Sequence, residues 1–221
     1  MTPTRIAIGD PDRPLTVATR YAAAAPAPVR LVLAHGAGAG QQHPFMVATA
    51  LGLAERGIEV VTFDFPYMRA RRSVPDKAPV LEQCFREVVS AVAGDGEARL
   101  FIGGKSMGGR MATHLAAQHL DDLSGVVALG YPLHPPGRPE QPRLAHLPSI
   151  AVPVLIVQGE RDTFGTPAEL APVIETMTAQ VTLHVVAGGD HSLKTRGKNA
   201  DQTFAGVLDT IATWIAAVPG L

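Results

Sequence analysis

The sequence contains one cysteine, Cys84, among 221 residues. A single cysteine excludes a disulfide within the chain, and its place on the apolar face of a predicted helix favours core packing. An excess of charge of one sign is also missing, because 19 Lys and Arg stand against 20 Asp and Glu. This balance gives no reason to expect nucleic acid or an acidic membrane as a partner. No apolar run approaches the length that spans a membrane.

Targeting and metal-binding patterns are absent as well. The first residues, Met1 to Arg5, are not a charged segment followed by an apolar stretch, so no signal peptide is visible and the cytoplasm is the expected location. No His-Glu-x-x-His segment and no cysteine cluster occurs, so we expect neither a metal nor an organic cofactor. We expect one domain over 1–221 with a core at about 29–217, as a monomer or homodimer.

Apolar runs and amphipathic segments alternate along most of the chain. The runs predicted as buried strands are 29–34, 58–65, 98–102, 126–129, 154–158 and 181–186. One helix is predicted to begin near Pro44, where proline suits the first turn. Four more are predicted at 80–92, 107–118, 167–177 and 201–217. Two further segments, 5–8 and 16–21, are candidates for edge strands. This alternation predicts an α/β fold, with a mostly parallel sheet covered by helices on both faces.

A serine flanked by glycines stands where one strand gives way to a helix. Gly104-Lys105-Ser106-Met107-Gly108 has the form G-x-S-x-G, the pattern of a strained turn that exposes a nucleophilic serine. Larger side chains two residues before or after Ser106 would collide with the neighbouring strand and helix. The turn leaves the Met107 amide free at a helix N-terminus, where negative charge is stabilised.

Two nucleotide-binding patterns overlap these glycine-rich segments and are the alternatives to this interpretation. Gly104-Lys105-Ser106 also ends a P-loop pattern, but the first glycine of that loop would fall at Arg99, and a strand occupies the intervening positions. Gly36 and Gly38 start a dinucleotide-binding pattern, but its third glycine would fall at Gln41. Both patterns fail in their structural context.

An activated serine needs a histidine as base and an acid that orients it, in the chain order Ser, acid, His. Asp162 follows the strand 154–158 and is the predicted acid, with Glu160 as the alternative. His191 is the predicted base, since it alone of eight histidines lies between the last strand and the last helix. The second oxyanion donor beside Met107 is expected from the Ala37 amide, with Gly38 as the alternative, because the glycine-rich loop follows the first core strand.

Five segments carry a resemblance to a known family. The chain resembles the α/β-hydrolase-like family that contains bacterial hydrolases of the dienelactone-hydrolase type, testis-expressed protein 30 and a subunit of the NSL histone acetyltransferase complex. The matching segments are Gly103-Gly104-Lys105-Ser106-Met107-Gly108-Gly109-Arg110, Gly130-Tyr131-Pro132-Leu133-His134-Pro135-Pro136, Pro153-Val154-Leu155, Asp190-His191-Ser192-Leu193 and Arg196-Gly197-Lys198. The resemblance implies an α/β-hydrolase fold with a serine triad, and the triad positions fall on Ser106, Asp162 and His191. It implies no particular substrate.

The segment 131–150 stands where α/β-hydrolases insert their cap domains. It holds six prolines and shows no helical period, and it is too short for a cap domain. We therefore expect a stiff, minimal Pro-rich cap loop at the rim of an open site.

These features together predict a serine hydrolase that cleaves a carboxylic ester or thioester of a small acyl substrate. A peptidase, an acyltransferase or a non-catalytic interaction domain with the same fold are the alternatives. Lys105, Arg72, Tyr131 and His134 are candidate substrate contacts. If Lys105 and the basic residues 69, 71 and 72 line the mouth of the site, an anionic substrate is favoured; otherwise these charges belong to a solvated loop.

Overall fold

A computed structural model describes residues 2–10, 12, 15–24, 28–94, 98–195 and 199–219. The segment Arg196-Gly197-Lys198, one of the five that carry the family resemblance, lies outside these residues. Eight strands form one sheet: β1 (Thr4–Ile8), β2 (Thr16–Tyr21), β3 (Val29–Ala34), β4 (Glu59–Phe63), β5 (Arg99–Lys105), β6 (Leu123–Leu129), β7 (Val154–Gly159) and β8 (Val181–Val186). The helices are α1 (Pro44–Glu55), α2 (Pro66–Arg69), α3 (Ala78–Val92), α4 (Met107–Ala117), α5 (Pro167–Ile174) and α6 (Ala200–Ala217), with a 3-10 turn η1 (Leu147–Ser149).

The sheet has the strand order β1-β2-β4-β3-β5-β6-β7-β8. Strands β1 and β2 are antiparallel to their neighbours, and the strands from β4 through β8 run parallel to one another. The predicted fold class is therefore confirmed. The N-terminal pair of candidate strands forms, although only β1 is an edge strand, since β2 lies between β1 and β4.

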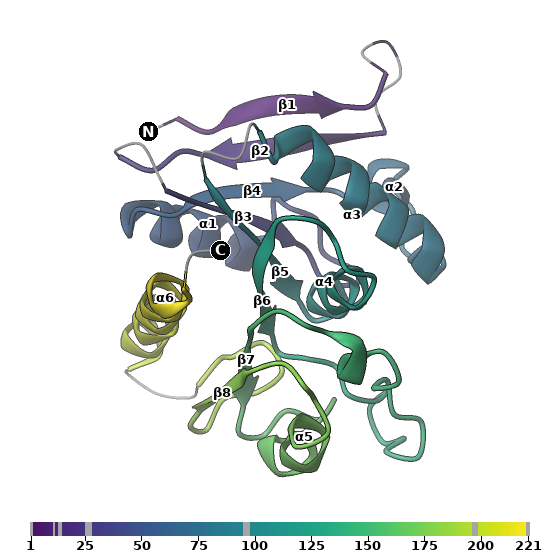
Figure 1. Ribbon diagram of the computed structural model, residues 1–221, viewed down its shortest axis with the longest axis vertical. Helices are drawn as coiled ribbons and strands as arrows, with labels where there is room; N and C mark the ends of the chain where they lie inside the picture. The colour runs from purple at the N-terminus through teal and green to yellow at the C-terminus, as the bar shows by residue number, and fades with distance from the viewer. Residues whose placement is uncertain are drawn as a thin grey trace.

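Two apolar clusters, one on each face of the sheet, make up the core. Helices α1 and α6 cover one face, and α3 and α4 pack on the other, as Figure 1 shows. The apolar face of α3 is buried at Leu81, Cys84, Phe85, Val88 and Val92. On α6, Val207, Leu208, Ile211 and Ile215 are buried against the opposite face. Cys84 is a free, buried thiol that packs in the core.

Several predicted boundaries are wrong by a few residues, and the short helix α2 was not predicted. Strand β5 continues past Ile102 through two glycines to Lys105, because Gly103 and Gly104 pair with both β3 and β6. Helix α5 ends at Ile174 rather than Met177, since the Met177 amide bonds back only three residues, to the Ile174 carbonyl. The extension of β5 places Ser106 directly at the carboxyl edge of the sheet, the edge at which ligands bind in such folds.

Candidate active site

Ser106 occupies the turn between β5 and α4 with φ 51° and ψ −114°. A positive φ is unusual for a residue with a side chain and marks a backbone held under strain. The surrounding chain holds this conformation by hydrogen bonds: the Ser106 amide donates to the Leu129 carbonyl at 2.9 Å, and the Ser106 carbonyl accepts from the Arg110 amide at 3.0 Å. The turn projects the hydroxyl into a cavity.

The flanking glycines are needed because the backbone passes too close for a side chain. A Cβ atom at Gly104 would lie 2.4 Å from the Gly108 carbonyl carbon and 2.6 Å from the Ala34 carbonyl oxygen. A Cβ atom at Gly108 would lie 2.3 Å from the same oxygen. Helix α4 therefore crosses β3 and β5 at a distance that only glycine permits, as the G-x-S-x-G pattern predicts.

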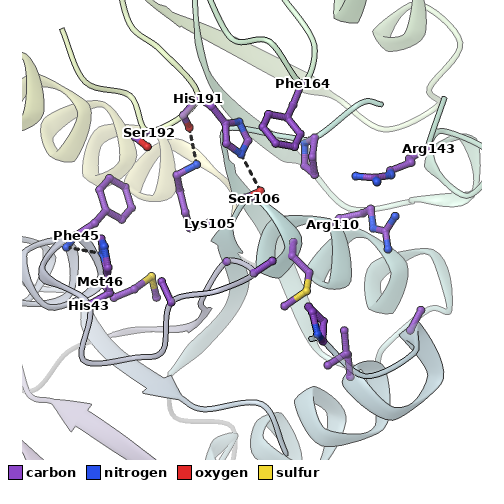
Figure 2. Close-up of a pocket in the computed structure, with 18 of the residues that line it drawn as sticks. His43, Phe45, Met46, Lys105, Ser106, Arg110, Arg143, Phe164, His191 and Ser192 are labelled. Atoms are coloured by element: carbon purple, nitrogen blue, oxygen red, sulfur yellow. Dashed lines mark hydrogen bonds between the residues drawn. The ribbon is translucent and has the colours of Figure 1, made fainter. Parts of the chain in front are cut away.

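His191 lies in the loop between β8 and α6 and faces both Ser106 and Asp162. Its Nε2 is 2.8 Å from the Ser106 Oγ, and its Nδ1 is 2.9 Å and 2.8 Å from the two carboxylate oxygens of Asp162. A carboxylate can only accept, so Nδ1 carries the proton and the bare Nε2 accepts the serine hydroxyl. The structure thus brings together the three residues predicted from chain order (Figure 2, which labels Ser106 and His191).

Asp162 is buried and held by two donors besides the histidine. The Gln158 side-chain amide donates to Oδ2 at 2.9 Å, and the Phe164 backbone amide donates to Oδ1 at 2.8 Å. The alternative acid, Glu160, is exposed and accepts from the Gly188 amide at 2.6 Å, so it is engaged away from His191. Sequence reasoning did not find Gln158 as a positioning residue, although its place four residues before Asp162 at the end of β7 was visible.

The glycine-rich loop after β3 is fixed by buried polar contacts. The Phe65 amide donates to His35 Nε2 at 3.0 Å, and His35 Nδ1 donates to the Gly36 carbonyl at 2.8 Å. Burial lowers the pKa of His35, which agrees with a neutral ring in these roles. Further along, the Gln41 amide donates to Asp64 Oδ1 at 2.7 Å. The loop between these anchors carries Ala37, which lines the cavity together with Met107. Met107 begins α4, so its amide has no acceptor within the helix.

A cavity of about 560 Å³ opens at Ser106. Figure 2 shows His43, Phe45 and Met46 on one side of Ser106 and Arg110 and Arg143 on the other. The cavity therefore has a largely apolar arm toward α1 and a basic arm toward α4 and the loop before η1.

Lys105 is the one proposed substrate contact that lines this cavity. Its ammonium donates to the His191 carbonyl at 2.5 Å, so it also holds the loop that carries the histidine. Burial lowers the pKa of Lys105 to about 8, against the opposing effect of the Asp162 and Asp190 carboxylates.

The other three proposed contacts lie elsewhere, and these predictions need correction. Tyr131 is buried in the core and donates its hydroxyl to the Arg143 carbonyl at 2.6 Å. His134 is buried, with its Nε2 3.3 Å from Glu169 on α5. Arg72 is exposed and pairs at 2.6 Å with Asp76, which lines the cavity, but Arg72 itself is not part of the lining. The segment 131–150 is only partly a rim loop, because its first four residues pack inward and the exposed part follows.

The sequence analysis missed several residues of the cavity wall, among them Phe164, Arg110 and Arg143. Arg110 had a readable signal, since it follows Ser106 by four residues at the start of a predicted helix and must share its face. Phe164 and Arg143 lie in loops, where no periodicity in the sequence indicates which way a side chain points.

Among the residues described here, no helix has the length and apolar character required to cross a membrane. In the same residues, no group of three or more His, Cys, Asp or Glu side chains is arranged to hold a metal ion.

The sheet order, the strained serine turn and the facing histidine and acid define the class of this protein as an α/β hydrolase. The family described as the alpha/beta hydrolase domain matches residues 27–219, and the chain belongs to that family. The narrower likeness to testis-expressed protein 30 and the NSL complex subunit stays a prediction.

Solved structures from three bacteria share this fold along nearly the whole chain. A dienelactone hydrolase from Anabaena variabilis is 17% identical with a TM-score of 0.75, and the match covers 98% of both chains. A serine hydrolase without a lid from Xanthomonas campestris is 20% identical with a TM-score of 0.74, covering 98% of this chain and 97% of the other. Est1E from Butyrivibrio proteoclasticus is 15% identical with a TM-score of 0.73, covering 96% and 99%. At these identities the likeness establishes the fold alone.

Proposed function

We propose that this chain is a serine hydrolase that cleaves a carboxylic ester or thioester of a small acyl substrate through an acyl-enzyme. The observation that carries the proposal is the continuous contact from Asp162 through His191 to Ser106, with atoms 2.8–2.9 Å apart at each step. Three residues from three separate loops form this chain of hydrogen bonds, and two of them, Ser106 and His191, line a cavity large enough for a small substrate.

In the first half-reaction the Ser106 Oγ attacks the carbonyl carbon while His191 Nε2 accepts the hydroxyl proton. The negative charge that forms on the carbonyl oxygen is stabilised by the Ala37 and Met107 amides, which are the proposed oxyanion donors. The protonated His191 then donates to the departing alkoxide or thiolate, leaving an acyl group on Ser106. Asp162 holds the ring and stabilises the imidazolium during this step.

In the second half-reaction water replaces the serine hydroxyl as the nucleophile. His191 Nε2 accepts a proton from water as its oxygen attacks the acyl carbon, and then returns a proton to Ser106 Oγ as the ester bond breaks. The products are a carboxylic acid and the free enzyme. The transfer between Ser106 and His191 uses groups already in contact, and the other transfers involve only His191, the substrate and water, so this scheme uses no cofactor.

The comparisons support a hydrolase over the alternative of a non-catalytic interaction domain. The similar structures include an esterase domain from Rhodothermus marinus, a serine hydrolase without a lid and a puromycin-hydrolyzing peptidase from Mycobacterium tuberculosis. The cytoplasmic location, the monomer or homodimer state and the division into one domain stay predictions.

The test is labelling with a fluorophosphonate probe, which reacts with activated serines, followed by assays on short p-nitrophenyl esters and thioesters. We expect the native protein to label and to hydrolyse esters, and Ser106→Ala to lose both, with kcat reduced by about 10⁶-fold. A folded native protein that neither labels nor hydrolyses any ester would contradict the proposal and favour an interaction domain.

A further inference from the structure

Two arginines with no acidic partner form the wall of the basic arm of the cavity. Arg110 lies on α4 one helical turn after Ser106, and Arg143 lies in the loop before η1. Figure 2 shows both side chains on the same side of Ser106, away from Phe45 and Met46. A substrate held at Ser106 would therefore extend one end toward these two groups.

Neither guanidinium forms an ion pair or side-chain hydrogen bond within the described part of the chain, and the Nε of Arg110 is buried without a partner. Other arginines of the protein are paired, as Arg56 is with Asp209 and Arg72 with Asp76. Burial and the nearby charge of Arg110 both lower the pKa of Arg143, which indicates that the two cations lie close together. Two neighbouring, partly desolvated cations without an anion are unfavourable, and a ligand anion would relieve this.

The charge of the whole cavity agrees with an anionic ligand. Lys105 and Lys194 also line it. Asp76 is the one acidic residue among the described lining residues, and it pairs with Arg72 through Oδ1, while its Oδ2 is buried without a partner. A guanidinium binds a carboxylate or a phosphate through paired N–H donors. The Asp76 carboxylate and the apolar surfaces of Pro132 and Phe164 in the same cavity favour a monoanion over a more strongly hydrated dianion.

We propose that Arg110 and Arg143 bind a carboxylate of the substrate, so that the preferred substrate is an ester or thioester with a second, ionised carboxyl group. This inference rests on the proposed hydrolase function. It assigns the two arginines a role in specificity: they recognise a part of the substrate remote from the bond that is cleaved.

The experiment compares two esters that differ in one charge, p-nitrophenyl hydrogen adipate and p-nitrophenyl methyl adipate. We expect the native protein to prefer the carboxylated ester by about 10- to 100-fold in kcat/KM, as hydrogen bonds to a charged group imply. In Arg143→Gln and Arg110→Gln that preference should collapse, with the loss mainly in the carboxylated ester. Arg138→Gln is the matched control, because Arg138 is an exposed arginine of the same loop that does not line the cavity.

The outcomes separate this inference from the proposed function. Equal kcat/KM for the two esters in a native protein that labels with fluorophosphonate would overturn the inference and leave the hydrolase intact. A phosphate-bearing ester hydrolysed more than tenfold faster than the carboxylated one would overturn the assignment to a carboxylate.

Absence of labelling would contradict the hydrolase itself. The arginines would then be tested alone by calorimetry, which compares the binding of monomethyl adipate to Ser106→Ala and to the same protein with Arg143→Gln added. Equal heats from these two proteins would overturn the inference. Thermal unfolding checks that each variant is folded.

Discussion

The Phe164 ring stacks on the His191 imidazole, with ring centroids 4.0 Å apart and planes inclined by 25°. The backbone amide of the same residue donates to Asp162, so Phe164 contacts two of the three residues proposed as the triad. Phe164 thus covers the histidine on one face and fixes the acid that orients it. The position of the imidazole depends on this contact as well as on the hydrogen bonds at its two nitrogens.

Removing this ring is expected to impair catalysis more than stability. In Phe164→Ala the imidazole loses its packing partner and can rotate away from Ser106, so we expect kcat for p-nitrophenyl acetate to fall about 10- to 100-fold. The rate of fluorophosphonate labelling should fall in parallel, because it depends on the same base. Phe164→Leu, which keeps apolar cover over the ring, should retain most of both. A native labelling rate in Phe164→Ala would contradict this role.

The two acids after β7 should differ sharply when each is neutralised. Asp162→Asn replaces the acceptor for His191 Nδ1 with an amide that can present a donor and hold the wrong tautomer, so we expect kcat to fall about 10⁴-fold. Glu160→Gln removes an exposed carboxylate that contacts only the Gly188 amide among the contacts described, and kcat should change less than threefold. Steady-state kinetics on one ester decides between them. The reverse order would assign the triad acid to Glu160.

A methyl group at Gly104 should destabilise the fold. The nearest atoms to the added Cβ would be backbone, at 2.4 Å, and backbone cannot move aside as a flexible side chain can. We expect Gly104→Ala to lose about 3 kcal/mol or more of unfolding free energy, or to fail to fold. Gly206→Ala is the control, since this exposed glycine of α6 has nothing within 4 Å of the added atom. It should gain about 0.5–1 kcal/mol. Urea unfolding measures the unfolding free energy of both variants. Equal unfolding free energies for Gly104→Ala and Gly206→Ala would contradict the steric argument.

The fold and the meeting of Ser106, Asp162 and His191 could be predicted from sequence for one physical reason: both depend on local chain order. Ser106, Asp162 and His191 each follow an apolar strand, and parallel strands bring their carboxyl ends to one edge of the sheet. Tyr131 and His134 could not be placed in this way, because a Pro-rich loop has no period to show which side chains face inward. Gln158, which lies 27 positions after Tyr131, holds this loop inward, because its Oε1 accepts a hydrogen bond from the Tyr131 amide at 2.8 Å.

Arg143 belongs to the same class of unpredictable residue. Arg143 enters the cavity because two hydrogen bonds anchor its backbone. Its carbonyl accepts from the Tyr131 hydroxyl, and its amide donates to the Leu133 carbonyl. Sequence alone directed attention to the basic residues around position 72, which follow a strand but lie outside the cavity. A basic site was therefore one of the two predicted alternatives, but of the four residues named for it only Lys105 lines the cavity.

The stability of the protein should rise with pH across the titration of Lys105. The pKa of this lysine falls from 10.5 to about 8 on folding, because burial disfavours its charge. Between these two values the unfolded chain binds a proton that the folded chain has released, so the unfolding free energy rises with pH. The full cost of the buried charge is present below about pH 8 and is gone above pH 10.5. Over this window we expect the native protein to gain about 2–3 kcal/mol relative to Lys105→Met.

The difference between the two proteins is the decisive quantity, because it cancels the titration of all other groups. Urea unfolding at pH 7, 8.5 and 10 should show the native protein gaining on Lys105→Met as the pH rises. Lys194→Met removes an exposed lysine of the same cavity and should follow the native protein in parallel. If Lys105→Met also runs parallel, the ammonium is well solvated through the open cavity. Its hydrogen bond to the His191 carbonyl would then hold the histidine loop without the cost of a buried charge.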